Sequence, residues 1–219
     1  MTDQVSPERT SRGLSPRLLE IVSAVLLSVA TVATAWSGYQ ASRWNGEQAK
    51  VGARANASRL ESTRASDLAN RNAQIDVAVF VQWVDAYARD ETVLADFYRE
   101  RFREEFRPAF EAWIATTPLT NPAAPLSPFA MPEYVLEADV EAKRLEAAAT
   151  AYADQARAYI QRSSNYVLAV TLFAAALFFA GISTKLESPG PRVAVLGLGC
   201  ALFLGTVTWI ATFPVSVSI

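Results

Sequence analysis

Long uncharged segments alternate with charged segments along this chain. No charged side chain occurs in the 22 residues between Glu20 and Arg43, in the 22 residues between Arg162 and Lys185, or in the 27 residues after Arg192. A helix of about 20 mainly apolar residues crosses roughly 30 Å of hydrocarbon and satisfies its own backbone hydrogen bonds there. The pattern therefore predicts three transmembrane helices.

Prolines and glycines divide the chain further. Ser15 and Pro16 are typical of a helix N-cap and of the first residue of a helix. In chain order we expect a disordered tail at 1–14, a first span at 15–42, an extramembrane helical domain at 43–163 with a proline-rich loop at 116–132, a second span at 164–184, a turn at 185–192, a third span at 193–213 and a tail at 214–219. The predicted fold class is all-α, an integral membrane protein with three transmembrane helices and a coiled-coil-like bundle of long helices outside the membrane.

The first uncharged segment also fits a second interpretation. Arginines, an apolar run and then Ala33-Thr34-Ala35 resemble a cleavable secretory signal. An uncleaved anchor is favoured by Glu20 at the start of the apolar run and by the helical pattern that continues past residue 35. The sequence leaves both interpretations open, and both place the helical domain on the far side of the membrane.

Aromatic and basic side chains follow the first span. Trp36, Tyr39 and Arg43 are spaced i, i+3 and i+7, so they share one helix face, and Trp44 is the next residue. Amphipathic rings and snorkelling arginines favour the membrane–water interface. We predict that these four residues anchor the first helix there.

Two segments of the domain repeat apolar or small residues in alternating steps of three and four, which is the spacing of a coiled coil. The seam within 38–72 consists mostly of small residues. The second seam includes Leu145, Ala149, Tyr152, Ala156 and Tyr159. We expect its helix to begin at Pro132-Glu133 and to continue into the second span. Small seams predict either packing on a neighbouring helix of the same chain, which we favour, or self-association.

Between the two seams, residues 75–115 carry aromatic side chains at helical spacing, interrupted near Asp90-Glu91 and Arg101. Such a wide stripe is more often a domain core than a ligand site. The acidic residues of this region alternate with arginines, so we expect a salt-bridged surface rather than a cation site.

The last two spans are joined by Ser188-Pro189-Gly190-Pro191, and Pro-Gly suits the two central positions of a type II turn. In the third span, Gly197, Ala201 and Gly205 form a face of small residues, which permits close packing of helices in lipid. We expect this face to pack on the first or second span, with dimerisation as the alternative.

Composition removes several classes of function. The net charge of −2 gives no support for a nucleic-acid partner. The chain has no histidine, and its one cysteine, Cys200, lies in the third span. No phosphate-binding loop or hydrolase motif occurs. We predict a protein that is not an enzyme, with no catalytic, cofactor-binding or metal site and no cofactor.

Arginine outnumbers lysine 17 to 3 and alanine is frequent, which suggests a GC-rich bacterial genome. The short segments on one side of the predicted membrane carry the basic residues Arg9, Arg12, Arg17, Lys185 and Arg192. Because long translocated loops count little in the positive-inside rule, we expect a multi-pass protein of the bacterial inner membrane. Its N-terminus would lie in the cytoplasm and its helical domain outside.

Residues 35–49, AWSGYQASRWNGEQA, resemble a stretch in a family of bacterial three-span membrane proteins of unknown function. The resemblance implies one N-terminal span, an Ala-rich helical region and a C-terminal pair of spans. It implies no activity and no functional residues.

Two functions fit these observations. We expect a protein of the lipid bilayer that acts by helix-mediated self-association, as a homo-oligomer, or by binding a membrane protein partner. The alternative is an oligomeric channel or a transporter accessory subunit, in which the first span lines a pore through Ser23, Ala30, Thr34 and Ser37. The uncharged segments 21–42, 163–184 and 193–219 contain no Asp, Glu, Lys or Arg of the kind that coupled transporters need.

Overall fold

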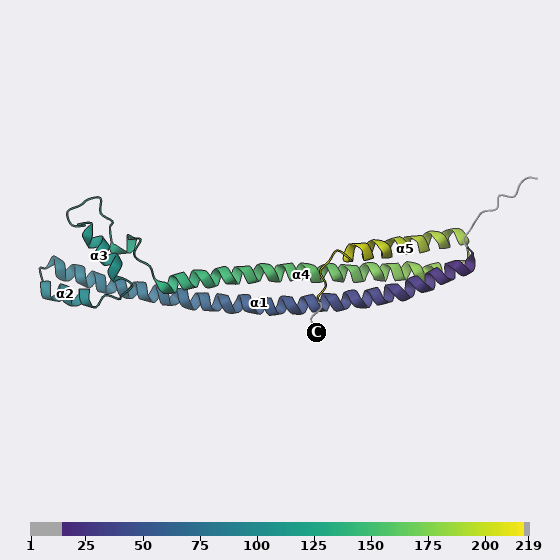
Figure 1. Ribbon diagram of the computed structural model, residues 1–219, viewed down its shortest axis with the longest axis horizontal. Coiled ribbons are helices and arrows are strands. Elements are labelled where there is room, and N and C mark those ends of the chain that lie inside the picture. Colours follow the sequence, from purple (N-terminus) through teal and green to yellow (C-terminus); the bar gives the residue numbers. More distant parts are fainter. Residues whose placement is uncertain (1–14, 217–219) are drawn as a thin grey trace, which may run out of the picture. The chain divides into compact units, whose positions relative to one another are not determined.

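The chain folds into helices joined by short links and one longer loop (Figure 1). The computed structural model describes residues 15–216, and no strand occurs in that range. In chain order the helices are α1 (Pro16–Ala88), α2 (Thr92–Glu100), α3 (Arg107–Ala115), the 3-10 helix η1 (Pro128–Ala130), α4 (Glu137–Ser183) and α5 (Pro189–Ile210). The predicted all-helical class is confirmed. The tail predicted at 1–14 lies outside the described residues.

Three of these helices, α1, α4 and α5, are long and apolar enough to cross a membrane. The prediction of three such helices is therefore confirmed in length and composition. α1 continues through Ala33-Thr34-Ala35 without interruption, as the helical pattern at those residues indicates.

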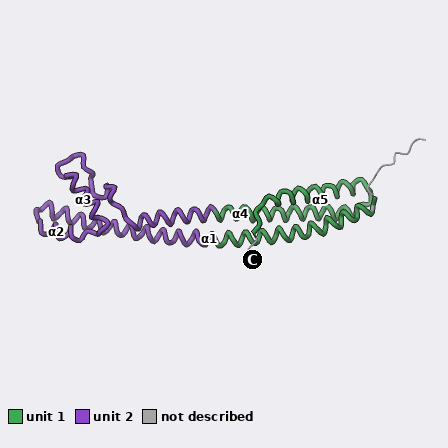
Figure 2. The backbone as a smooth tube through the Cα atoms, in the orientation of Figure 1, with its two compact units in different colours: residues 1–50, 155–219 green, residues 51–154 purple. Residues whose placement is uncertain are grey.

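Contacts divide the chain into two units (Figure 2). The three-helix unit comprises residues 1–50 and 155–219, and the aromatic unit comprises residues 51–154. α1 and α4 each contribute one part to both units. The division lies at 50 and 154 rather than at the predicted domain borders of 43 and 163. One reason is that the rings of Trp44 and Tyr159 contact each other, with centroids 5.2 Å apart, which ties both residues to the three-helix unit.

In the three-helix unit, α1 and α4 lie antiparallel. Ser163 Oγ donates a hydrogen bond to the carbonyl oxygen of Ala41 at 2.9 Å. Ser23 Oγ lies 3.2 Å from Ser183 Oγ. Later residues of α1 therefore contact earlier residues of α4, as expected for an antiparallel pair.

Small side chains fill the interior of this unit. Ala30, Ala169, Ala176 and Ala180 are all fully buried. Alanine leaves room for helix backbones to approach closely, which is how helices associate where no water drives them together.

The close contact of α5 involves Gly199 rather than the predicted face. A Cβ at Gly199 would lie 3.3 Å from the carbonyl oxygen of Ala176 and 3.3 Å from Phe179 Cβ. The predicted face is exposed instead, and a Cβ at Gly197 or Gly205 would meet nothing within 4 Å. The prediction that this face packs on another span of the chain is wrong. Gly199 follows Gly197 by two residues. It therefore lies about 200° around the helix axis, on nearly the opposite face of α5.

The predicted type II turn between the last two spans is also wrong. No glycine among residues 15–216 has a positive φ, and a type II turn requires one at its third residue. Ser188 is the N-cap, with φ −80° and ψ 130°, and a proline opens α5. Proline is tolerated in a first helical turn because its missing N–H would be unpaired there anyway. α5 therefore begins at Pro189, four residues before the predicted span.

In the aromatic unit, α1 and α4 also pack on each other. Ser62 Oγ donates a hydrogen bond to the carbonyl oxygen of Ala142 at 2.8 Å. The small seam of α1 is buried within the chain, at Ala41 and Trp44 in the three-helix unit and at Val51, Ala55, Ser62 and Ala69 here. Packing within the chain, the favoured alternative, is confirmed for these residues.

α4 begins at Glu137 rather than at Pro132-Glu133. The backbone N–H of Tyr134 donates to the carbonyl oxygen of Met131 at 3.0 Å, and that of Val135 donates to Glu133 at 3.0 Å. These short-range bonds hold the chain in turns that delay the helix. The predicted loop at 116–132 is otherwise confirmed and contains only the short helix η1.

Candidate functional site

The aromatic unit has a core made mainly of aromatic rings. Its buried members are Trp83, Ala86, Ala95, Phe102, Phe106, Phe110 and Trp113. Most ring pairs meet edge to face, as between Phe102 and Phe106, whose centroids are 5.0 Å apart. The interpretation of the 75–115 stripe as a core is confirmed for these buried rings, whereas Tyr87 and Phe97 of the same stripe are 50% and 45% exposed. The interruptions of this stripe, near Asp90-Glu91 and Arg101, coincide with the ends of α1 and α2.

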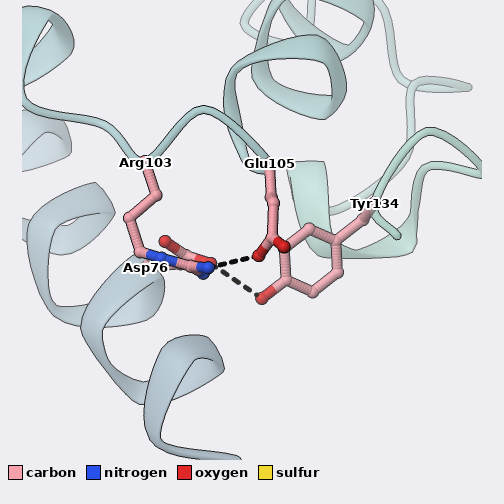
Figure 3. A network of polar contacts seen from close by, with 4 residues as sticks. All are labelled: Asp76, Arg103, Glu105 and Tyr134. Carbon is pink, nitrogen blue, oxygen red and sulfur yellow. Dashed lines mark hydrogen bonds and ion pairs between the residues drawn. The ribbon is translucent and has the colours of Figure 1, made fainter. Parts of the chain in front are cut away.

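Beside this core lies a buried carboxylate, Asp76, whose side chain is 1% exposed (Figure 3). Its Oδ2 accepts hydrogen bonds from Arg103 Nη1 at 2.9 Å and from the Tyr134 hydroxyl at 3.2 Å. Arg103 also pairs with Glu105. Asp76 Oδ1 is buried and has no hydrogen-bond partner among the described residues. The network joins α1 to the segment before α3 and to the segment before α4.

The electrostatics of this network follow from burial. Burial raises the pKa of the Asp76 carboxyl above its ordinary value, and attraction to Arg103 and hydrogen bonding only partly offset it. Burial and the negative charge of Asp76 raise the pKa of Tyr134, so its hydroxyl remains a donor. Burial alone would lower the pKa of Arg103, but Glu105 and Asp76 outweigh it and the pKa is raised. The cluster therefore holds a buried carboxylate between an arginine and a tyrosine hydroxyl.

An apolar pocket of about 520 Å³ opens between the end of α1, α3 and the loop after α3. Ten residues line it and none of them is charged: Trp83, Val84, Tyr87, Ala88, Trp113, Ile114, Thr117, Pro118, Leu119 and Thr120. Trp113 Nε1 donates to the carbonyl oxygen of Pro125 at 2.8 Å, which fixes one wall. The Leu119 side chain is 74% exposed at the rim. Apolar pockets with few polar groups are typical of binding sites.

Within residues 15–216, no group of three or more His, Cys, Asp or Glu side chains is placed to hold a metal ion. Several acidic residues of the region pair with arginine or lysine, as in Glu141 with Arg144 and Asp139 with Lys143.

The four predicted interface anchors differ in how far their side chains are exposed. Trp36 and Tyr39 are 45% and 51% exposed, and their ring centroids are 5.9 Å apart. Arg43 is half-buried. Trp44 is buried in the three-helix unit, where it packs on Tyr159. The interfacial role stays a prediction, and the structure separates Trp44 from the outward-facing rings.

The predicted seam of α4 faces inward. Ala149 and Ala156 are buried, and Leu145, Tyr152 and Tyr159 are half-buried. The residues suggested as a pore lining are enclosed as well. Ser23, Ala30 and Ser37 are at most 1% exposed within this one chain. Thr34 is half-buried, and its hydroxyl donates to the carbonyl oxygen of Ala30 at 2.7 Å.

Two important polar residues were not predicted from the sequence. Asp76 is the only charged residue between Arg71 and Asp85, and it shares a helix face with Phe80 and Trp83, so a lone charge within the aromatic stripe was an available signal. Gln40 is fully buried in the three-helix unit. The backbone N–H of Ser216 donates to Gln40 Oε1 at 2.9 Å, and Gln40 Nε2 donates to the Ser216 carbonyl at 3.4 Å.

In comparisons with protein-family models, with curated proteins and with solved structures, nothing matches this chain.

Proposed function

We propose that the chain is a non-enzymatic, three-span protein of the bacterial inner membrane that binds a partner protein through its aromatic unit. The observation that carries the binding function is the uncharged pocket between α1 and α3, with exposed apolar side chains at its rim. Exposed apolar surface of this kind marks interaction sites. The seams of α1 and α4 are buried between these two helices, so the pocket is the better candidate for binding a partner protein.

Membrane attachment is supported by the pairing of α1 with α4. The hydrogen bond between Ser163 and Ala41 places Arg162 and Arg43, the ends of two uncharged segments, at the same level. The contact between Ser23 and Ser183 aligns the opposite ends. Two helices whose apolar segments begin and end together fit one slab of hydrocarbon.

The side chains on the outside of the three-helix unit support the same proposal. Exposed apolar residues are spread over all three helices, including Ile21, Val25, Val32, Phe178 and Leu204. Soluble proteins rarely expose so much contiguous apolar surface. We further propose that α1 is retained as an anchor, and that the N-terminus is cytoplasmic because the basic residues Arg17, Lys185 and Arg192 flank that side.

Depth-dependent quenching tests the membrane proposal. A Cys200→Ser chain receives one new cysteine for a fluorescent probe, either at Val29 in the uncharged part of α1 or at Val93, which is 84% exposed in α2. In liposomes with quencher-labelled acyl chains, we expect strong quenching at position 29 and little at 93. Equal, weak quenching at both positions would contradict the proposal.

Photo-crosslinking tests the binding proposal. A photoreactive residue replaces Tyr87, which lines the pocket and is 50% exposed, or Val140, which is 55% exposed on α4 and lies outside the pocket. In native membranes we expect a discrete adduct from position 87 only, lost when Leu119→Glu places a charge at the rim. An adduct with a second, differently tagged copy of the chain would identify the partner as the chain itself. Adducts of equal yield from both positions would refute the pocket as the binding surface.

The channel alternative gains no support, because Ser23, Ala30 and Ser37, three of the four residues suggested as a pore lining, are buried against helices of the same chain.

A further inference from the structure

The guanidinium of Arg162 in α4 lies over two aromatic rings of the three-helix unit. Its guanidinium carbon lies 4.7 Å from the ring centroid of Trp44 and 5.4 Å from that of Tyr159. The two rings contact each other, and Trp44 is buried. Stacking of this kind orients an arginine and leaves the N–H groups at the edge of the guanidinium plane available to an acceptor.

No carboxylate neutralises this arginine. Among residues 15–216, Arg162 forms no ion pair. The neighbouring stretches 43–50 and 154–162 contain the four basic residues Arg43, Lys50, Arg157 and Arg162 and the two acidic residues Glu47 and Asp154, a net charge of +2. The surroundings of Arg162 therefore favour an anion.

Arg162 also lies where a lipid headgroup would be. It is the last charged residue before the uncharged segment 163–184, and the hydrogen bond from Ser163 to Ala41 places it level with the end of the uncharged segment of α1. The exposed rings of Trp36 and Tyr39 lie within the preceding turns of α1, as in the aromatic belt of a membrane–water interface.

We propose that Arg162, oriented by Trp44 and Tyr159, binds the phosphate group of an anionic phospholipid at this end of the spans. Guanidinium binds phosphate through two parallel N–H···O bonds, and the excess of positive charge selects an anionic lipid over a zwitterionic one. This inference rests on the membrane attachment proposed above. It goes beyond attachment by assigning one residue and one lipid class.

Native mass spectrometry of the full chain in detergent measures this selectivity. Phosphatidylglycerol and phosphatidylcholine with identical acyl chains are titrated separately, and the bound fraction gives an apparent Kd for each. We expect tighter binding of phosphatidylglycerol, and a loss of roughly 10-fold in its affinity with Arg162→Ala, the scale expected for charge-assisted hydrogen bonds. Lys185→Ala, which removes a charge from the far end of the same apolar segment, is the matched control and should change little.

Arg162→Lys separates the geometry from the charge. Lysine keeps the charge but lacks the planar fork, so we expect partial recovery, with affinity between those of the wild type and Arg162→Ala. If Arg162→Ala does not fold, as judged by thermal unfolding in detergent, the comparison of wild type with Arg162→Lys decides the question. Wild-type affinity in Arg162→Lys would overturn the bidentate site.

Inorganic phosphate distinguishes a lipid site from a simple anion site. We expect millimolar inorganic phosphate to leave phosphatidylglycerol bound. Displacement of the lipid by phosphate, equal binding of the two lipids, or equal losses in Arg162→Ala and Lys185→Ala would each overturn the proposal. The probe at position 29 reports on membrane attachment separately, so failure of lipid selectivity with that probe still quenched leaves attachment intact.

Discussion

The two units of this chain are built in opposite ways, although α1 and α4 contribute to both. Alanine, glycine and hydroxyl groups such as Ala176, Gly199 and Ser183 are frequent inside the three-helix unit, beside a few large side chains such as Phe173, and many large apolar side chains lie outside. The aromatic unit has rings inside, and charged pairs such as Arg144 with Glu141 on its surface. We attribute the difference between the two interiors to the different surroundings proposed for the two units.

In water, removing large apolar side chains from solvent stabilises a core, and rings contribute the most area. In lipid, an apolar side chain gains nothing by turning inward, so association depends on close packing and on hydrogen bonds between helices. The contrast in composition is therefore what we expect if the proposed membrane surrounds only the three-helix unit.

The strongest test of this contrast compares two buried phenylalanines. Phe106 in the aromatic unit and Phe173 in the three-helix unit are both fully buried. We expect Phe106→Ala to lower the free energy of unfolding of its unit by about 3–5 kcal/mol. Phe173→Ala should cost less, because in lipid it loses packing with Phe203 but no hydrophobic transfer energy.

Hydrogen exchange of the full chain in nanodiscs measures both variants, because it reports protection separately for peptides of each unit. Phe97→Ala is the control for the aromatic unit, since Phe97 is 45% exposed on α2. Equal losses for Phe106→Ala and Phe173→Ala would mean that both interiors are stabilised by the same force, and the contrast between the units would be lost.

The second prediction concerns the one buried charge of the aromatic core. We expect Asp76→Asn to destabilise this unit by about 2–3 kcal/mol, because Arg103 loses a charge-assisted hydrogen bond and keeps only Glu105. Burial raises the pKa of Asp76 above that of the unfolded chain. Its protonated form is therefore favoured by folding.

The sign of the pH effect follows. The stabilisation linked to this raised pKa is fully present below the unfolded value of about 3.9 and is lost as the pH rises through the folded value. The stability of wild type relative to Asp76→Asn should therefore increase as the pH falls from 7 toward about 4. Denaturant titrations of both chains at several pH values measure it, and a difference that shrinks toward acid would contradict the assigned shift.

The sequence predicted those features that depend on neighbouring residues. The three apolar helices, the aromatic core and the proline-rich loop all follow from local periodicity and composition. The ion-pair network did not, because Arg103 and Tyr134 are 27 and 58 residues away from Asp76 and meet it only in the folded chain. The start of α4 was misplaced for a related reason, since turns around Tyr134 compete with the helix.

The contact face of α5 shows a further limit of sequence reasoning. Small residues occur on two faces of this helix, one with Gly197 and the other with Gly199. Periodicity reveals both faces equally well. The face with more small residues was predicted to pack on another span, and that prediction was wrong. Which face is used depends on the positions of Ala176 and Phe179 in α4, which no local pattern of α5 contains.

The third prediction tests the close packing of the three-helix unit with a matched pair of glycines. Gly199→Val must displace α5 from α4, because even its Cβ would lie 3.3 Å from backbone of α4. We expect a loss of about 1–3 kcal/mol, the usual cost of overpacking. Gly197→Val meets open space, and valine has a better helix propensity than glycine, so we expect no destabilisation. Thermal unfolding in detergent compares them, and similar midpoints would show that α5 does not pack as described.

The smallest expected effect concerns serine hydroxyl groups that contact the opposite helix, which occur in both units. Ser23 Oγ lies 3.2 Å from Ser183 Oγ but already donates to the carbonyl oxygen of Leu19 at 2.8 Å. Ser62 Oγ has no such alternative and donates directly to Ala142 of the opposite helix. We expect Ser23→Ala to cost about 0.6 kcal/mol, the average for hydrogen bonds between helices in lipid. Ser62→Ala should cost about 1 kcal/mol, because a buried carbonyl loses a partner. Hydrogen exchange near positions 142 and 183 ranks the two, and a larger loss at 183 would mean that hydroxyl groups, rather than small side chains, hold the three-helix unit together.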